Sequence, residues 1–147
     1  MVHALRQIHR WLRPRGVLLD LHPEPEHAGL EVWQDGTVRQ IGRTANEEDL
    51  ADIHDARGRL RQLEDEGWYS TQEQRVFDLV SHFPSPDDWL EFQDQEGYTT
   101  VVDGDLLNAA RDLINSGGGE FIVREPIRAS LLTSLHKGTA NARPGNL

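Results

Sequence analysis

The chain has 147 residues and no cysteine, and its 25 Asp and Glu residues outnumber its 15 Lys and Arg residues, which gives a formal net charge of -10. This charge opposes binding to nucleic-acid phosphates and anionic lipids, so we predict no nucleic acid and no membrane among its partners, while the lack of cysteine excludes disulfides and thiol catalysis. With no apolar run near the ~20 residues of a membrane span, we expect a cytoplasmic protein with one domain over 1–136 and a flexible tail over 137–147.

The first segment predicts a helix, a tight turn and a strand. Leu5, Ile8 and Leu12 share one stripe of a 3.6-residue period, and Pro14 ends the helix. Gly16 supplies the turn, and the apolar run Val17 to Leu21 follows it. Because this run lacks polar alternation, it predicts a strand covered on both faces, as in a parallel α/β sheet.

The middle of the chain predicts a hairpin and a long helix. The two prolines of Pro23–His27 indicate a loop, and Asp35-Gly36 between two alternating segments is a strong hairpin signal. A helix should then run from about Asn46 to Glu66 and end at Gly67. Its apolar face is made of Leu50, Ile53, Leu60 and Leu63.

The rest of the chain predicts two strands with two helices between them. A strand over Gln74–Phe83 ends at Pro84, and a helix begins with the Ser85 cap. A second helix covers Gly104–Asn115, and the last strand covers Glu120–Leu132. Trp89, Leu90 and Phe92 are expected on the inner side of the first helix. The core parity of the last strand is expected to contain Phe121, Val123, Ile127, Ala129 and Leu131.

The segment from Ala4 to Asp20 resembles the stretch of class I S-adenosylmethionine-dependent methyltransferases that contains the helix before the fifth sheet strand and that strand itself. It departs at Arg15, where the family has glycine. The resemblance implies an α/β fold, a partial Rossmann-like methyltransferase sheet with a first strand and then antiparallel C-terminal strands, a β-hairpin insertion and flanking helices. In that family the last strand inserts antiparallel between the two strands before it. The order of elements agrees as far as Leu132.

The family holds its cofactor with a glycine-rich loop and acidic residues that precede the matched stretch. No G-x-G-x-G follows a predicted strand here, and Gly117 to Gly119 follow a helix, where glycines end helices in the left-handed conformation. S-adenosylmethionine is therefore implied by the resemblance alone. We expect the chain to lack the cofactor half, to have no cofactor-binding residues and to be inactive by itself.

His22 and Asp20 are the candidate catalytic residues, because open α/β sheets place ligands beyond the carboxyl ends of their strands. In related methyltransferases the loop after this strand lines the acceptor pocket, so His22 could act as a general base or orient the acceptor. The alternative is a polar strand-end residue whose ring bonds a nearby carbonyl.

Two further sets of side chains have open interpretations. Trp68 and Tyr69, between a helix-ending glycine and a strand, are substrate-side candidates at a pocket edge, although such rings are more often core residues. The loop from His22 to His27 contains ligand types that suit zinc, yet its prolines make it stiff and an acidic surface loop explains it equally well. We therefore predict no metal site, and keep a metal-dependent hydrolase as a third hypothesis.

These observations leave two main functional hypotheses. The chain is the acceptor-side half of a methyltransferase, an enzyme only when a missing N-terminal half or a partner completes it. Alternatively, it is a non-catalytic interaction module that forms a homodimer or pairs with a partner chain through an exposed sheet edge at Val17 to Leu21, since an apolar edge strand normally needs a cover. The identity of the methyl acceptor does not follow from the sequence.

Overall fold

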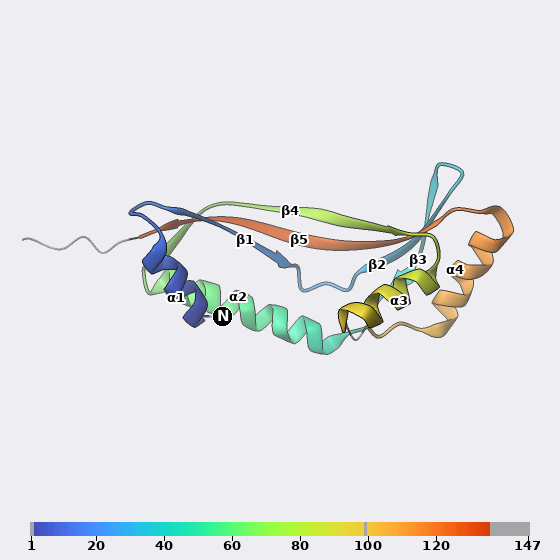
Figure 1. Cartoon of the computed structure of the whole chain (residues 1–147), viewed down its shortest axis with the longest axis horizontal. Helices are drawn as coiled ribbons and strands as arrows, with labels where there is room; N and C mark the ends of the chain where they lie inside the picture. Colours follow the sequence, from blue (N-terminus) through green and yellow to red (C-terminus); the bar gives the residue numbers. More distant parts are fainter. Residues whose placement is uncertain (1, 99, 136–147) are drawn as a thin grey trace, which may run out of the picture. The chain divides into compact units, whose positions relative to one another are not determined.

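The computed structural model describes residues 2–98 and 100–135. Over these ranges the chain forms an α/β fold with four helices and an open antiparallel sheet of five strands (Figure 1). The elements in chain order are α1 (Val2–Trp11), β1 (Val17–Pro23), β2 (Gly29–Gln34), β3 (Thr37–Arg43), α2 (Glu47–Asp65), β4 (Tyr69–Phe83), α3 (Pro86–Glu96), α4 (Gly104–Gly117) and β5 (Glu120–Ser134). The predicted tail over 137–147 lies outside the described residues.

The last strand, β5, is the centre of the sheet. It pairs with β1 and β2 in the strand order β1-β5-β2-β3, and it also pairs with β4. The Ser134 N–H donates to the Gly16 carbonyl at 2.8 Å on the β1 side, and the Leu135 N–H donates to the Trp68 carbonyl at 2.9 Å on the β4 side. The strand order places β5 between β1 and β2, and β4 pairs with β5 off this path, so the methyltransferase arrangement of the last strand stays a prediction.

The chain divides into two compact units, which we describe separately. The first unit contains 1–21, 55–75 and 129–147, and the second contains 22–54 and 76–128. The prediction of one domain over 1–136 is not tested by this division and stays a prediction. No helix of the described part has both the length and the apolar character needed to cross a bilayer.

The core of the first unit joins α1 to the end of α2 and to the strands. Its fully buried members are Leu63 and Leu132, both 0% exposed, and Tyr69 at 1%. Leu5, Ile8 and Leu12 of the predicted α1 stripe all pack in this cluster. Burying side chains of this size contributes roughly 1.5–3 kcal/mol each, so this stripe anchors α1.

The second unit is built on the predicted hairpin. β2 and β3 pair antiparallel from Gly29/Arg43 to Gln34/Thr37. Asp35 and Gly36 have φ of 50° and 76°, the left-handed values that a tight hairpin turn requires. β2 also pairs with β5, with Val32 opposite Phe121. The hairpin prediction is confirmed.

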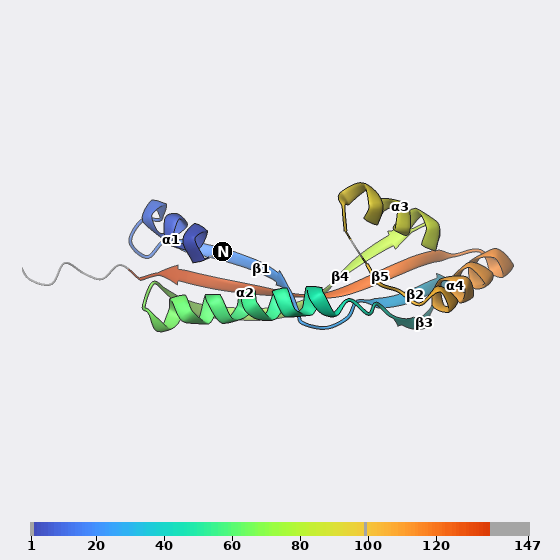
Figure 2. The ribbon, with the colours of Figure 1, turned by 90° about the horizontal axis from the view of Figure 1, so that it is seen from below.

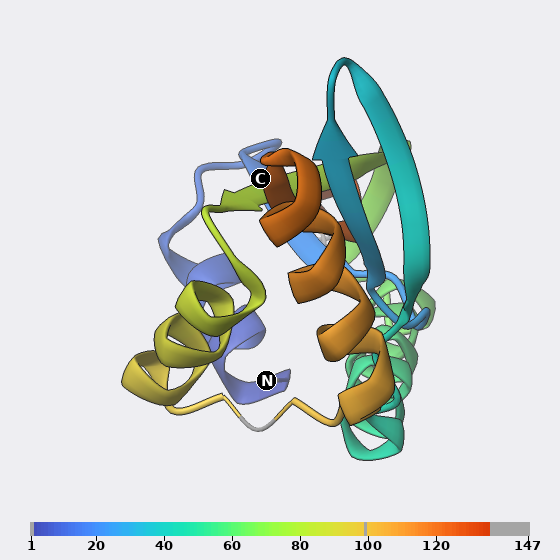
Figure 3. The ribbon, with the colours of Figure 1, turned by 90° about the vertical axis from the view of Figure 1, so that its right-hand side faces the viewer.

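Helices α3 and α4 complete the second unit. Ser85 caps α3 and Pro86 is its first residue, as the turn signals predict, and Gly97 ends the helix in the left-handed conformation at φ 74°. Gly118 ends α4, as expected of the glycine cluster, but its φ of 73° and ψ of -173° are not the left-handed helical conformation. Helix α4 contacts β2 and β3 and lies beside the hairpin (Figures 2 and 3).

The prediction that the Val17–Leu21 run is covered on both faces is wrong for the described residues. Val17, Leu19 and Leu21 are 55%, 58% and 55% exposed, and they alternate with half-buried residues. The pairing partner of β1 is also antiparallel. Leu18 packs against the core cluster of this unit, so only the face of the strand that contains Leu18 is buried.

Three smaller predictions also need correction. Strand β4 begins at Tyr69 instead of Gln74. The residues between these two positions are polar, so they lack the apolar pattern from which a strand is predicted. Phe92 is 43% exposed and does not share the burial of Trp89. In β5 the three consecutive residues Phe121, Ile122 and Val123 are all buried, whereas near its end the buried residues are the even ones, Ser130, Leu132 and Ser134, so Leu131 is not on the core face.

Arg15 occupies the turn between α1 and β1 with φ 62°. A non-glycine residue in this region costs about 1–2 kcal/mol, partly offset by the greater freedom that glycine has when unfolded. The next residue must be glycine, because a Cβ at Gly16 would lie 2.8 Å from the Arg13 carbonyl oxygen. Arg15 therefore adopts the conformation that favours the glycine of the methyltransferase family.

We predict that Arg15→Gly raises the free energy of unfolding by about 1 kcal/mol, because the left-handed strain disappears. Urea denaturation followed by circular dichroism measures the change. Arg13→Gly is the matched control, since the φ of Arg13 is not positive, and it should be neutral or destabilising. Equal stability of Arg15→Gly and the parent chain would contradict the assignment of this turn.

Candidate functional site

A cavity of about 1170 Å³ opens in the second unit next to the loop that follows β1. Its walls come from this loop, the start of α2, α3 and the segment after it, and the facing parts of β4 and β5. Five carboxylates line it: Glu24, Glu26, Glu47, Asp52 and Glu125. His27 is the one imidazole, and among the described residues no Lys or Arg side chain lines it. The cavity is therefore acidic.

Three of these carboxylates have basic partners. Glu24, 8% exposed, pairs with the Arg128 Nε at 2.5 Å. Glu26 lies 4.0 Å from Arg43, and Glu47 lies 3.4 Å from the His27 Nε2. The Glu24 N–H donates to the Pro126 carbonyl at 2.7 Å, so the loop after β1 is tied to β5 by both its backbone and its charge.

Glu125 differs from these three. It shares its strand parity with Val123, which is 5% exposed, but Glu125 itself is exposed and lines the cavity. Desolvation by the neighbouring protein raises the pKa of Glu125. In the part of the chain that the structure describes, no basic side chain forms an ion pair with Glu125.

Aromatic rings form another part of the cavity wall: Phe83, Trp89, Phe92 and Tyr98. Trp89 is 2% exposed and its ring centroid lies 5.5 Å from that of Phe121, which anchors it in the core. The centroids of Phe83 and Phe92 are 5.7 Å apart. Phe92 and Tyr98 are 43% and 61% exposed, so these two rings are accessible to a ligand.

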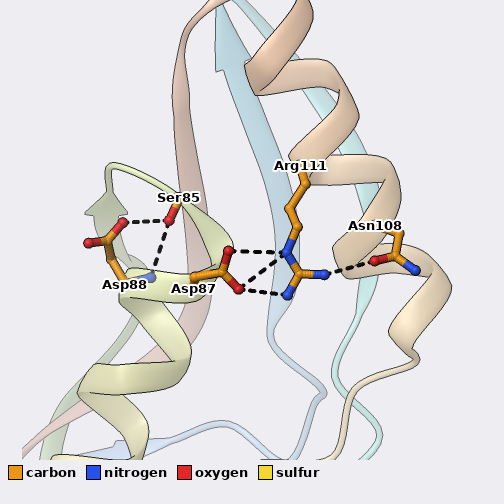
Figure 4. A network of polar contacts seen from close by, with 5 residues as sticks. All are labelled: Ser85, Asp87, Asp88, Asn108 and Arg111. Atoms are coloured by element: carbon orange, nitrogen blue, oxygen red, sulfur yellow. Dashed lines mark hydrogen bonds and ion pairs between the residues drawn. The ribbon is translucent and has the colours of Figure 1, made fainter.

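An ion-pair network fixes α3, which supplies Trp89 and Phe92 to the cavity, against α4 (Figure 4). Arg111 donates to both carboxylate oxygens of Asp87 at 2.7–3.2 Å and to the Asn108 amide oxygen at 2.8 Å. These hydrogen bonds lower the pKa of Asp87. Planar bidentate pairing of this kind restrains geometry, so the aromatic wall has a defined position within its unit.

His22 and Asp20 lie within β1, which extends to Pro23, so His22 is not beyond the strand end as predicted. Both are half-buried and share the strand parity of Leu18. Pro23, Glu24, Glu26 and His27 line the cavity, whereas His22 and Asp20 do not. The loop after the strand thus reaches a cavity, but the two candidate catalytic residues are not in its wall, and their role stays a prediction.

The structure places Tyr69 in the core instead of at a pocket edge. It is 1% exposed, its hydroxyl donates to the Leu5 carbonyl at 2.6 Å, and burial raises the pKa of Tyr69. Trp68 is half-buried and stacks edge-on against His9 at 5.0 Å between centroids. Neither ring lines the cavity of the second unit.

The residues of the His22–His27 loop do not form a metal site in this structure. Over the described ranges, no group of three or more His, Asp or Glu side chains gathers in a way that could hold a metal ion. His27 lies beside Glu47 and the carboxylate of Glu24 is taken by Arg128. The third hypothesis therefore receives no support from the geometry.

Comparison of the chain with models of known protein families, with curated proteins and with solved structures finds no match in any of the three.

Glu125 is the site residue that the sequence analysis missed. Its signal was available, since a charged residue interrupts the apolar parity Phe121, Val123, Ile127 of a predicted strand. The exposed aromatic residues after α3 carried no comparable signal, because only the fold brings Tyr98 to the same cavity as the loop after β1.

The first unit contains a second polar cluster, which is centred on Glu66. Glu66 accepts hydrogen bonds from Arg6 at 2.6 Å, from the Trp68 indole at 2.9 Å and from Gln62 at 2.8 Å. The Arg6 guanidinium is the largest cause of the lowered pKa of Glu66. A carboxyl whose folded pKa is depressed stabilises the fold above its unfolded pKa, and this contribution disappears as the pH falls through the folded pKa.

We predict that Glu66→Gln lowers the free energy of unfolding at about pH 7, and that the difference from the parent chain shrinks at about pH 3. Urea titrations at the two pH values measure it. Glu73→Gln is the control in the same unit, because it removes only the exposed ion pair with Arg75. A Glu66→Gln effect of equal size at both pH values would exclude the ionic origin.

Proposed function

We propose that the chain is the acceptor-side half of a class I S-adenosylmethionine-dependent methyltransferase with a partial Rossmann-like sheet, which cannot methylate without a cofactor half. The observation that carries the proposal is the pairing of β5 with β1 and with β4. A last strand that enters antiparallel between the two preceding main strands is the arrangement that the resemblance of Ala4–Asp20 implies. The left-handed φ of Arg15 supports the same alignment.

The two insertions between these main strands account for the cavity. The β2–β3 hairpin and its flanking loops separate β1 from α2, and α3 with α4 separates β4 from β5. Residues of these connections line the cavity beside the end of β1, where a sheet of this kind holds its ligands. We assign the cavity to the methyl acceptor; His22 and Asp20 lie outside its wall, and their catalytic role stays a prediction.

Methyl transfer requires the sulfonium carbon to be held in line with the acceptor atom. The chain has no glycine-rich loop between a strand and a helix that could hold the donor. A donor site must then come from a segment or partner that adds to β1, which ends the strand order and leaves Val17, Leu19 and Leu21 exposed.

We predict that the chain as given does not bind S-adenosylmethionine in isothermal titration calorimetry. Extending it by the codons that precede Met1 in the same reading frame should add a glycine-rich strand–loop–helix and produce binding at about micromolar Kd. Tight binding by the unextended chain would contradict the proposal, and an upstream frame without such a motif would exclude a donor half in the same chain and leave only a separate partner. S-adenosylhomocysteine, which occupies the same donor site, is the positive control for the extended chain.

A second candidate, a non-catalytic interaction module, is favoured by the same exposed strand. Two copies of β1 can pair antiparallel about Leu19, which places Val17 of each copy opposite Leu21 of the other. This pairing would satisfy the backbone groups of an edge strand and place the three exposed side chains of each copy beside those of the other on one sheet face. Closed two-fold pairing of this kind forms dimers and does not propagate.

The module hypothesis predicts a dimer in light scattering at about 100 µM, in the range of moderate interfaces. Leu19→Lys should convert it to a monomer, because a lysine on each copy would meet its symmetry mate. Val38→Lys replaces a residue of comparable exposure, 48%, on β3 and should stay dimeric. A parent chain that is monomeric at this concentration would exclude the homodimer form of the module, and the calorimetric test of the methyltransferase proposal does not depend on it.

A further inference from the structure

The cavity of the second unit has a composition that selects among ligands. Its carboxylates outnumber its basic side chains, since none of its described lining residues is Lys or Arg. Arg128 pairs with Glu24 and Arg43 pairs with Glu26, but neither arginine lines the cavity. An anionic ligand such as a phosphate or carboxylate would meet repulsion there.

Glu125 gives the cavity an uncompensated charge. Its neighbours along the strand, Arg124 and Arg128, are committed elsewhere: Arg124 to Glu31 and Asp78, and Arg128 to Glu24. The carboxylate is exposed and belongs to the lining of the cavity. A ligand cation in the cavity would supply the ionic partner that the described residues do not provide.

The aromatic wall points to the same class of ligand by a separate interaction. Phe92 and Tyr98 line the cavity with rings that remain accessible. The negative face of an aromatic ring attracts an ammonium group, and the attraction grows where water is excluded. The apolar part of such a ligand can contact Ile53, Leu79 and Val101, which also line the cavity.

We propose that this cavity binds an organic ammonium ion with an apolar body, held by Glu125 and the accessible rings of Phe92 and Tyr98. The inference rests on the proposed function only in naming the conjugate amine of this ion as the methyl acceptor, since the nitrogen has a lone pair for the methyl group only after its proton has passed to solvent; binding of the ammonium ion is a property of the chain alone. The acceptor class is therefore an amine, not a carboxylate, a phosphate or a nucleic acid.

Phenethylammonium is the probe, with 2-phenylethanol and phenylacetate as its neutral and anionic analogues. Titrations into the full chain, followed by the amide resonances of Val123, Glu125 and Ile127 and the Trp89 indole N–H, should show saturable shifts for the ammonium ion at about millimolar Kd. The two analogues should bind at least about fivefold more weakly. Equal binding of the alcohol, or shifts confined to residues outside the cavity, would overturn the proposal.

Glu125→Gln should weaken phenethylammonium binding about three- to fivefold, the size of one partly solvated ion pair. This variant keeps the fold, because desolvation penalises the ionised carboxylate that it removes. Glu91→Gln, on α3 of the same unit but outside the lining of the cavity, should leave binding unchanged. Unchanged binding in Glu125→Gln would contradict the proposal. Binding of the donor by the extended chain without ammonium binding would overturn this inference alone.

Discussion

The hydrogen bonding of β5 on both of its edges is the constraint on which the structure depends. The Ser134 N–H donates to the Gly16 carbonyl and the Leu135 N–H donates to the Trp68 carbonyl. The end of the last strand is therefore hydrogen-bonded to segments from the first half of the chain. A backbone with unpaired buried groups is costly, and β5 supplies the partner groups for β1, β2 and β4 alike. Until β5 is in place, none of these three strands has its full set of partners, and neither core, the one around Leu132 in the first unit nor the one around Phe121 in the second, is complete.

The pairing of β5 also determines where the chemistry can occur. Val123, Glu125 and Ile127 reach the cavity because β5 passes beside the loop that follows β1, to which Pro126 is hydrogen-bonded. Glu24 is neutralised by Arg128, whereas Glu125 is not paired within the described residues. Glu24 therefore has a structural role, since it ties a loop to a strand, whereas Glu125 is the carboxylate to which we assign ligand binding.

Local signals in the sequence predicted the elements that depend on a few neighbouring residues. Asp35-Gly36 fixes a hairpin by its turn geometry, and Ser85-Pro86 fixes the start of α3 by capping, so both were predicted at the correct place. The exposure of Leu19 and the change of buried parity along β5 were not predictable, because they depend on which element covers each face. Phe121 and Leu132 are both core residues although their parities differ. Glu125 was detectable as a charge on an apolar parity, but its cavity, which joins residues from both halves of the sequence, was not.

Backbone nuclear Overhauser effects at the end of β5 test the central pairing most directly. The account predicts contacts from Ser134 to Gly16 and from Leu135 to Trp68 in the same sample, one from each edge of the strand. Contacts to only one of these two partners would contradict the insertion of β5 between β1 and β4, and with it the assignment of the fold to the acceptor side of a methyltransferase.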